Sequence, residues 1–196
     1  MDAVTLLRND HKTVEGLFKR FEKAGPNAHK TKQDVVAKIV EELSVHAAIE
    51  EQVFYPAVRK GVPEASADVL ESLEEHHIVK WVLSELDGMD VADERFTPKV
   101  TVLIENVRHH VAEEEDTLFP EIRKAMKRKE LEELAEALQK AKRTAPTHPH
   151  PRAPDTPPGN VIAGMAAAAV DKAEDTGKRT VRKVFGRARG KETKAG

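Results

Sequence analysis

Two short segments of the chain carry the same polar residues at the same helical spacing. The segment HAAIEEQVFYP places His46 four residues before Glu50, and HVAEEEDTLFP places His110 four residues before Glu114. Residues four apart lie on one face of an α-helix, one turn along, so each histidine and its glutamate can reach a common point. Because imidazole and carboxylate together bind iron, zinc, manganese or copper, the two segments predict a metal site.

The duplication extends to two earlier segments, each of which adds one histidine. NDHKTVEGLFKRF around His11 aligns with EEHHIVKWVLSEL around His76, with an acidic residue before each histidine and apolar residues in register. In an antiparallel bundle the inner faces of four helices converge, which would bring all of these side chains into one pocket. The predicted metal ligands are His11, His46, Glu50, His76, His110 and Glu114, with the two glutamates bridging a pair of ions.

The structural alternative is that these residues are ordinary surface pairs. A single His-x-x-x-Glu segment is more often an exposed i,i+4 pair than a ligand set. Burial of six such groups without compensation would cost several kcal/mol per charge, which bound cations would offset. The repetition in register therefore favours metal, and a two-metal centre in a helical bundle favours iron.

Several neighbouring residues compete for a place in the site. His109 and Glu113 have the ligand spacing one residue earlier, but His109 aligns with Val45 and is therefore rejected. His77 aligns with Lys12 and is predicted to be a neighbour rather than a ligand.

The remaining aromatic and acidic residues near the motifs receive supporting roles. Glu51 and Glu115 lie about 100° beyond the pocket face on a straight helix, which predicts contacts to the ligands or to solvent. Tyr55 is predicted to pack, with contact to the site as the alternative because Pro56 disturbs the helix. Trp81 is predicted to lie in the core. The other histidines, in loops or near the C-terminus, are predicted to be incidental, although the two in HPH could bind metal weakly: His29, His148 and His150.

The motif set resembles that of the hemerythrin-like proteins, the family with HHE cation-binding domains. The resemblance covers roughly residues 1–143 and includes the endings EEQVFYP and EEDTLFP. It implies two non-haem iron ions, oxo- or hydroxo-bridged, and dioxygen-related chemistry. The oxygen carriers of that family have two histidines one turn apart on the third helix. Here Ser72 and Lys80 flank His76 at that spacing, so an additional position on the irons should be open to water or an exogenous ligand.

Apolar periodicity predicts an all-α protein, an up-down-up-down four-helix bundle with a short fifth helix and a mostly disordered C-terminal tail. Pro56 and Pro120 should kink or end the second and fourth helices, and Thr97 with Pro98 should begin the fourth. The predicted helices run from Asp2, as N-cap, to the GP at 25–26, from about Thr31 to Lys60, from Pro63 to Leu86, from Thr97 to about Lys127, and over ELEELAEALQKAKR.

Composition divides the chain into three parts. Residues 1–143 hold 22 Lys/Arg against 29 Asp/Glu, a balance of −7, whereas residues 144–196 hold 10 against 5, a balance of +5. The predicted units are the bundle at 1–143, an extended, solvated Pro-rich linker at 144–160, and a basic, Ala-rich tail at 161–196. The tail could form an amphipathic helix, but a disordered tail is favoured.

The tail is expected to touch anionic surfaces only weakly, and with Phe185 as its one aromatic residue no specific nucleic-acid partner is predicted. The absence of cysteine excludes disulfide frameworks, thiolate metal sites and cysteine nucleophiles. No secretory signal or membrane-spanning stretch is recognised, so a cytoplasmic protein is predicted.

Three functions compete at this level. The favoured hypothesis is an enzyme that reacts with hydrogen peroxide in a catalase-like or peroxidase-like manner, with no catalytic residue assigned beyond the metal site and with Glu51 or Glu115 as acid–base candidates. The alternative is a module that binds or senses dioxygen, nitric oxide or iron without turnover. The third is a metal-free bundle whose basic tail binds an acidic partner.

Overall fold

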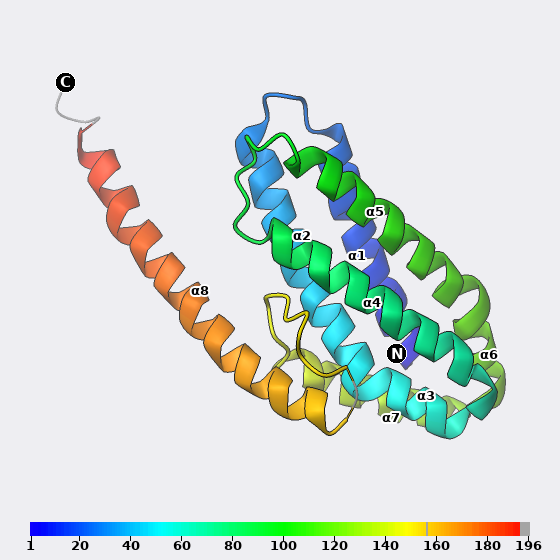
Figure 1. The fold of residues 1–196 in the computed structure, drawn as a ribbon. Coiled ribbons are helices and arrows are strands. Elements are labelled where there is room, and N and C mark those ends of the chain that lie inside the picture. Colours follow the sequence, from blue (N-terminus) through cyan, green and yellow to red (C-terminus); the bar gives the residue numbers. More distant parts are fainter. Residues whose placement is uncertain (156, 193–196) are drawn as a thin grey trace.

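The computed structural model describes residues 1–155 and 157–192, with side chains through residue 176, as a helical bundle with a long C-terminal helix (Figure 1). No strand occurs in these ranges, and the predicted all-α fold is confirmed. The helices are α1 (Ala3–Lys23), α2 (His29–Ile49), α3 (Tyr55–Gly61), α4 (Ser66–Leu86), α5 (Phe96–Glu113), α6 (Phe119–Ala125), α7 (Arg128–Lys142) and α8 (Gly159–Glu192). A 3₁₀ turn, η2 (Pro63–Ala65), precedes α4.

The sequence predicted the start of two helices from capping residues, and one of the two predictions is confirmed. The Asp2 side chain accepts a hydrogen bond from the Thr5 backbone N–H at 2.7 Å, as an N-cap residue should. By contrast, α5 begins at Phe96, so Thr97 and Pro98 lie inside its first turn instead of capping it. Proline is tolerated there because a first-turn N–H has no helical partner.

The buried apolar side chains form two clusters, and the predicted ligands lie between them along every helix. In α1, His11 separates Leu7 of the first cluster from Val14 of the second. In α4, His76 likewise separates Leu73 from Val79. The motif residues therefore form a polar layer inside the bundle, enclosed by apolar packing at both ends.

Pro56 and Pro120 lie where an α-helix is interrupted and then resumes, at the two places where a kink or an end was predicted. Each follows a π-helical turn, η1 (Glu50–Phe54) or η3 (Glu114–Leu118), after which the α-helix resumes. The Tyr55 N–H bonds to the Glu50 carbonyl, five residues back, and the Phe119 N–H bonds to Glu114 in the same way. A π turn inserts one residue and widens the helix, which relieves the clash that proline would otherwise cause.

This arrangement leaves one carbonyl in each π turn without a helical donor. The carbonyls of Glu51 and Glu115 lie five residues before Pro56 and Pro120, which have no N–H to donate. Groups from elsewhere in the chain satisfy both. The Asn160 amide donates to Glu51 O at 2.8 Å, and the Arg8 guanidinium donates to Glu115 O at 2.9 Å.

Residues 145–155 and 157–160, here called the C-terminal strap, fold back on the bundle. Ala145 is 8% exposed and Asn160 is 3% exposed, so the prediction of a solvated linker was wrong for these residues. Residues Gly159–Glu192 form α8, as the helical alternative for the tail had it, and this helix runs from η1 away along one side of the bundle (Figure 1). Residues 193–196 lie outside the described part, and the unit boundaries at 143/144 and 160/161 remain predictions.

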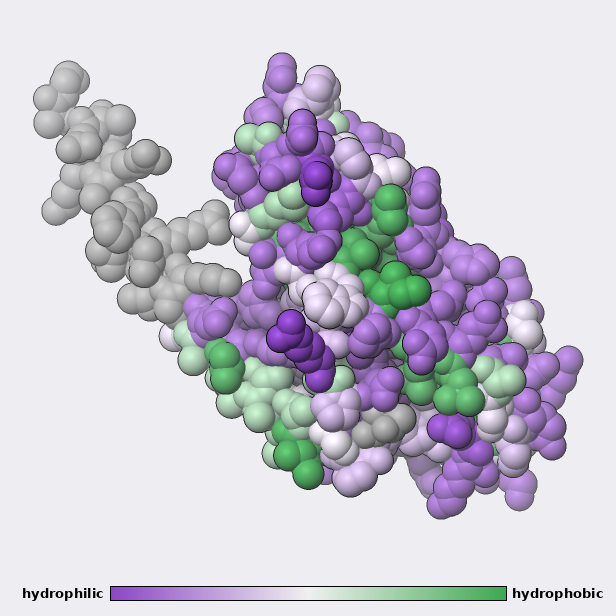
Figure 2. All heavy atoms as spheres, viewed as in Figure 1, coloured by the Kyte–Doolittle hydropathy of each residue, from purple (hydrophilic) through white to green (hydrophobic). Residues whose placement is uncertain are grey.

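Most of the face drawn in Figure 2 is hydrophilic, with apolar residues over α4 and along the first turns of α8. The large exposed apolar side chains of these two helices include Leu70, Ile78, Ile162 and Met165. Among the described residues, no helix combines the length and the apolar character that a membrane span requires.

Candidate metal centre

Six buried side chains from four helical segments converge at the polar layer. His11 comes from α1, His46 and Glu50 from α2 and η1, His76 from α4, and His110 and Glu114 from α5 and η3. Each of these residues is 0–5% exposed. The Nε2 atoms of His11 and His46 lie 3.2 Å apart, as do those of His76 and His110. The four rings thus form two pairs whose Nε2 atoms point at common centres.

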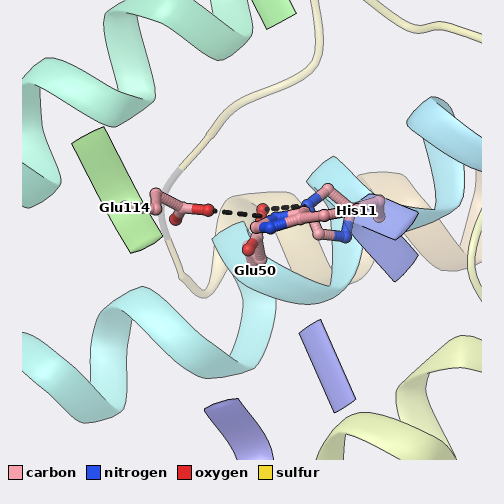
Figure 3. A group of neighbouring side chains, drawn as sticks. His11, Glu50 and Glu114 are labelled. Carbon is pink, nitrogen blue, oxygen red and sulfur yellow. Dashed lines mark hydrogen bonds and ion pairs between the residues drawn. The ribbon is translucent and has the colours of Figure 1, made fainter. Parts of the chain in front are cut away.

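The two glutamates join these pairs into one cluster. Glu114 Oε2 lies 3.3 Å from His11 Nε2, and Glu50 Oε2 lies 3.2 Å from His46 Nε2 and 3.4 Å from His76 Nε2. Figure 3 shows His11, Glu50 and Glu114 pointing toward one another. Two donor sets follow, each with atoms within 4.8 Å of one another: His11, His46, Glu50 and Glu114, and Glu50, His76 and His110. Glu50 belongs to both sets and is best placed to bridge two ions, while Glu114 Oε2 reaches His110 Nε2 as well, at a longer 3.6 Å.

Each histidine has a carboxylate near its other ring nitrogen, Nδ1. Those of His11 and His76 lie 2.9 Å from Glu115 Oε1 and 3.2 Å from Glu51 Oε1, respectively. An Nδ1–H bonded to a carboxylate fixes the tautomer in which Nε2 is free to bind a metal. Glu51 and Glu115 therefore act through the histidines, and each reaches the histidine of the opposite half of the chain.

The other two carboxylates belong to Asp10 and Glu75, the acidic residues that directly precede His11 and His76. Glu75 Oε2 lies 2.7 Å from His110 Nδ1, whereas Asp10 Oδ2 is 3.8 Å from His46 Nδ1 and its other oxygen accepts from Lys142. The acid before each histidine was noted in the sequence but given no role. Because an acidic residue stands at this position in both halves, the repeat could have predicted that Asp10 and Glu75 contact the ligands.

Tyr55 reaches into the cluster, which the sequence offered only as an alternative to packing. Its hydroxyl donates to Glu114 Oε1 at 2.9 Å and lies 3.4 Å from His76 Nε2. Burial and the carboxylates of Glu114 and Glu50 raise the pKa of the Tyr55 phenol well above its usual value. The hydroxyl therefore stays protonated and can serve as a hydrogen-bond donor.

The electrostatics of the cluster fit a cation. Burial, together with Glu114, raises the pKa of Glu50 well above its usual value, and neither Glu50 oxygen has a hydrogen-bond partner. Burial and the neighbouring His11 lower the pKa of His46 to about 4, so its ring is neutral near pH 7. Neutral imidazoles and partnerless buried carboxylate oxygens are the donor set that a divalent or trivalent cation satisfies.

The residues that the sequence set aside lie outside the cluster. His77 is exposed and accepts from the Trp81 indole N–H at 3.3 Å, and His109 is exposed beside Glu113. Trp81 is 43% exposed, so its predicted core position was wrong; the helix turns it outward while Lys80 is buried against Glu51 at 2.9 Å.

His148 and His150 had been predicted to be incidental, and for these two residues the prediction was wrong. His148 contacts Asp87 and Asp175 at 2.7 and 3.2 Å, and His150 contacts Asp171 at 3.1 Å. These contacts tie the C-terminal strap to the end of α4 and to α8. Neither these contacts nor that of Asn160 could be expected from local sequence, because each depends on the chain folding back.

Comparison with known proteins places this fold and site in a family. The Hemerythrin HHE cation binding domain model matches residues 2–122. The chain is 31% identical over 167 residues to an uncharacterised hemerythrin-like protein of Schizosaccharomyces pombe, covering 85% of this chain and 81% of that protein. The chain therefore belongs to the hemerythrin HHE cation-binding family, as its motifs predicted, and its buried His/Glu clusters are residues that could hold a metal.

Two further relatives show the fold and the reach of the family. The crystal structure of a hemerythrin HHE cation binding domain-containing protein from Mycobacterium kansasii superposes with a TM-score of 0.61 at 22% identity, covering 73% of this chain and 86% of that one. A DNA nickase of Nostoc is 30% identical over 142 residues, which is 72% of this chain but 39% of the nickase. The chain thus spans well under half of that relative, whose name describes the longer protein.

Proposed function

We propose that the six clustered residues hold two iron ions and that the protein reacts with hydrogen peroxide in a catalase-like or peroxidase-like manner. The observation that carries the proposal is the pair of donor sets that share Glu50, because one bridging carboxylate between two histidine pairs suits two ions better than one. When bound, such a pair supplies the redox equivalents that peroxide chemistry requires.

The space beside the cluster supports a very small ligand. A cavity of about 20 Å³ is bounded by the four histidines together with Val14, Leu43, Ala47, Val79, Val107 and Val111. A volume of this size holds about one water-sized molecule. Dioxygen, nitric oxide and peroxide approach that size, whereas organic substrates do not.

The protein's own groups can hold the histidines and glutamates in place around such a molecule. The Tyr55 hydroxyl is a buried, protonated donor that bonds Glu114 and lies 3.4 Å from His76 Nε2, but it is not among the side chains that bound the cavity. Lys80, which occupies one of the flanking positions of His76, is held by Glu51 at 2.9 Å. Tyr55 is therefore proposed to orient Glu114 and not to touch the bound ligand.

Metal analysis followed by oxygen release from peroxide tests the proposal. Wild-type protein should hold close to two irons per chain. The double variant His46→Ala/His110→Ala should hold none, because it removes one ligand from each histidine pair. His109, the exposed neighbour of His110, supplies a matched control, and His109→Ala should retain full iron. Tyr55→Phe should keep its iron yet release oxygen about tenfold more slowly, within the usual range for loss of a group that orients a metal ligand. Full iron in the double variant would refute the assignment of the ligands.

The second candidate is a module that binds dioxygen, nitric oxide or iron without turnover. The small apolar cavity favours it as much as it favours peroxide chemistry, since a diatomic ligand fits the same space. A stable absorbance change on adding dioxygen or nitric oxide, with no oxygen released from peroxide by the iron-loaded protein, would select this function over the first.

A further inference from the structure

Two surface hollows flank the cluster, and the internal duplication relates one to the other. The first, here called the α1/α5 groove, has a volume of about 530 Å³ and includes Ala112, Glu115 and Asp116 in its lining. The second includes Ala48, Glu51 and Gln52, which lie 64 positions earlier in the sequence. The two hollows are therefore equivalent faces of the two halves of the bundle.

The C-terminal strap covers only the second of these faces. Pro146, Pro149 and Asn160 form part of its lining, and the space left beneath them is about 40 Å³. A buried ion pair between Lys80 and Glu51 lies at its base. In the α1/α5 groove the position equivalent to Lys80 is Glu15, which points outward to Arg108.

The small cavity beside the histidines adjoins the open face and not the covered one. His11, Val14, Val107 and Val111 line both this cavity and the α1/α5 groove, so these side chains lie as a wall between the two spaces. Their counterparts in the other half also line the cavity, but none of them lines the pocket beneath the strap: His76, Val79, Leu43 and Ala47.

A second asymmetry lies on the surface above this wall. Gly16 lines the α1/α5 groove, and a Cβ atom at this position would meet nothing within 4 Å. The equivalent residue of the other half is Trp81, whose indole reaches back one turn to His77. The open face thus lacks the large side chain that its counterpart carries.

From these observations we propose that the α1/α5 groove is the entry route for small ligands, molecules of the size of peroxide or azide, and that they pass between Val14, Val107 and Val111 to reach the histidines. The C-terminal strap and the Lys80–Glu51 pair close the equivalent route on the other face. This inference rests on the proposed metal centre for the destination of the ligand, whereas the route itself depends only on the chain.

The substitution Gly16→Trp would copy the closed half onto the open one. A long side chain on a helix points back toward the N-terminus, so the indole would lie over the turn that contains Lys12, beside the wall. The helix should tolerate the change, because glycine is a poor helix former and the space is free. Gly16→Ala, which leaves the groove open, is the matched control.

Azide binding to the iron-loaded protein, followed by absorbance after rapid mixing, measures entry directly. Gly16→Trp should slow both the formation and the loss of the adduct about tenfold and leave its affinity unchanged, as expected of a steric gate. Gly16→Ala should match the wild type. Wild-type rates in Gly16→Trp would overturn the proposal.

The strap supplies the reciprocal test on the covered face. Asn160→Ala removes the donor to the Glu51 carbonyl and should loosen the strap, which the fluorescence of Trp81 would report because Trp81 lines a hollow with Pro149 and His150. Azide entry should stay at the wild-type rate. An increase of about tenfold would place the route beneath the strap and overturn the proposal.

A measurement on metal-free protein separates the route from the metal. Diethylpyrocarbonate should modify His11 faster than its counterpart His76, and Gly16→Trp should remove the difference while Gly16→Ala keeps it, as read by peptide mass spectrometry. Equal rates at both histidines in the wild type would overturn the route. Faster modification of His11 in a protein that forms no azide adduct would instead leave the route standing and refute the metal centre.

Discussion

The two halves of the bundle place their histidines and glutamates alike but surround them differently. In the second half His110 lies 2.7 Å from Glu75, and burial is outweighed by Glu114 and Glu75, so that the pKa of the His110 imidazole is raised. In the first half His46 is 3.8 Å from Asp10, and burial lowers the pKa of its imidazole to about 4. The two halves thus repeat the ligand positions but not the groups around them.

The aromatic residues after the π turns differ in the same way. Tyr55 donates a hydrogen bond to Glu114, whereas its counterpart Phe119 has no hydroxyl and stacks on the His11 ring at a centroid distance of 5.8 Å. One side of the cluster thus has a hydrogen-bond donor and the other has an apolar wall. A symmetric ligand frame can in this way hold two ions in unequal surroundings.

The largest effect should come from the two central carboxylates. Glu50 belongs to both donor sets and Glu114 to one, so Glu50→Gln should lose both ions and Glu114→Gln only one, as measured by metal analysis. Retention of both ions by Glu50→Gln would contradict its role as the bridge.

In the metal-free protein the order should reverse, with Glu114→Gln losing more unfolding free energy than Glu50→Gln. Burial opposes the charge of Glu114, but His110 and His11 outweigh it and hold the pKa of this carboxyl well below its usual value. Such a carboxylate adds stability above its unfolded pKa and loses it as the pH falls through the folded value. Near pH 7, Glu114→Gln should therefore cost about 3 kcal/mol in urea unfolding, whereas Glu50→Gln, whose carboxyl has a raised pKa, should cost far less.

An intermediate effect is expected at the equivalent positions of Lys80 and Glu15. Lys80→Met removes one partner of a buried ion pair and leaves Glu51 with His76 alone, which should cost about 3 kcal/mol of unfolding free energy. Glu15→Gln weakens an exposed pair with Arg108 and should cost less than about 1 kcal/mol. Equal losses in urea unfolding would show that the two halves are less different than their contacts indicate.

The smallest effect concerns the attachment of the C-terminal strap. Burial disfavours the charged form of His148, but Asp87 and Asp175 outweigh it and raise the pKa of its imidazole, with Asp171 nearby. The stabilisation is therefore full below the unfolded pKa near 6.5 and is lost as the pH rises through the higher folded value. Trp81 emission should shift toward that of exposed tryptophan over this range. His148→Gln should abolish the shift, and an unchanged transition in that variant would exclude His148 as its origin.

The sequence predicted the parts of this molecule that depend on local periodicity and on repetition. The helices, the N-cap at Asp2 and the family followed from spacing, and so did the six residues that the structure brings together. The π turns did not, because helical periodicity assumes a uniform rise and the effect of Pro56 can be a break, a kink or an inserted residue. The strap contacts of Asn160 and His148 did not either, since they join residues far apart in sequence.

The π turns also define what would have to be transplanted to move this site into another protein. A His-x-x-x-Glu pair written onto an ideal helix would lack the inserted residue, the proline that maintains it and an outside donor for the freed carbonyl. The smallest portable unit is therefore the whole segment from His46 to Pro56 with an amide or guanidinium supplied from a neighbouring element. Removal of a single residue between Glu51 and Phe54 should likewise reset the turn to an α-helix and bring the proline ring against the carbonyl four residues before it.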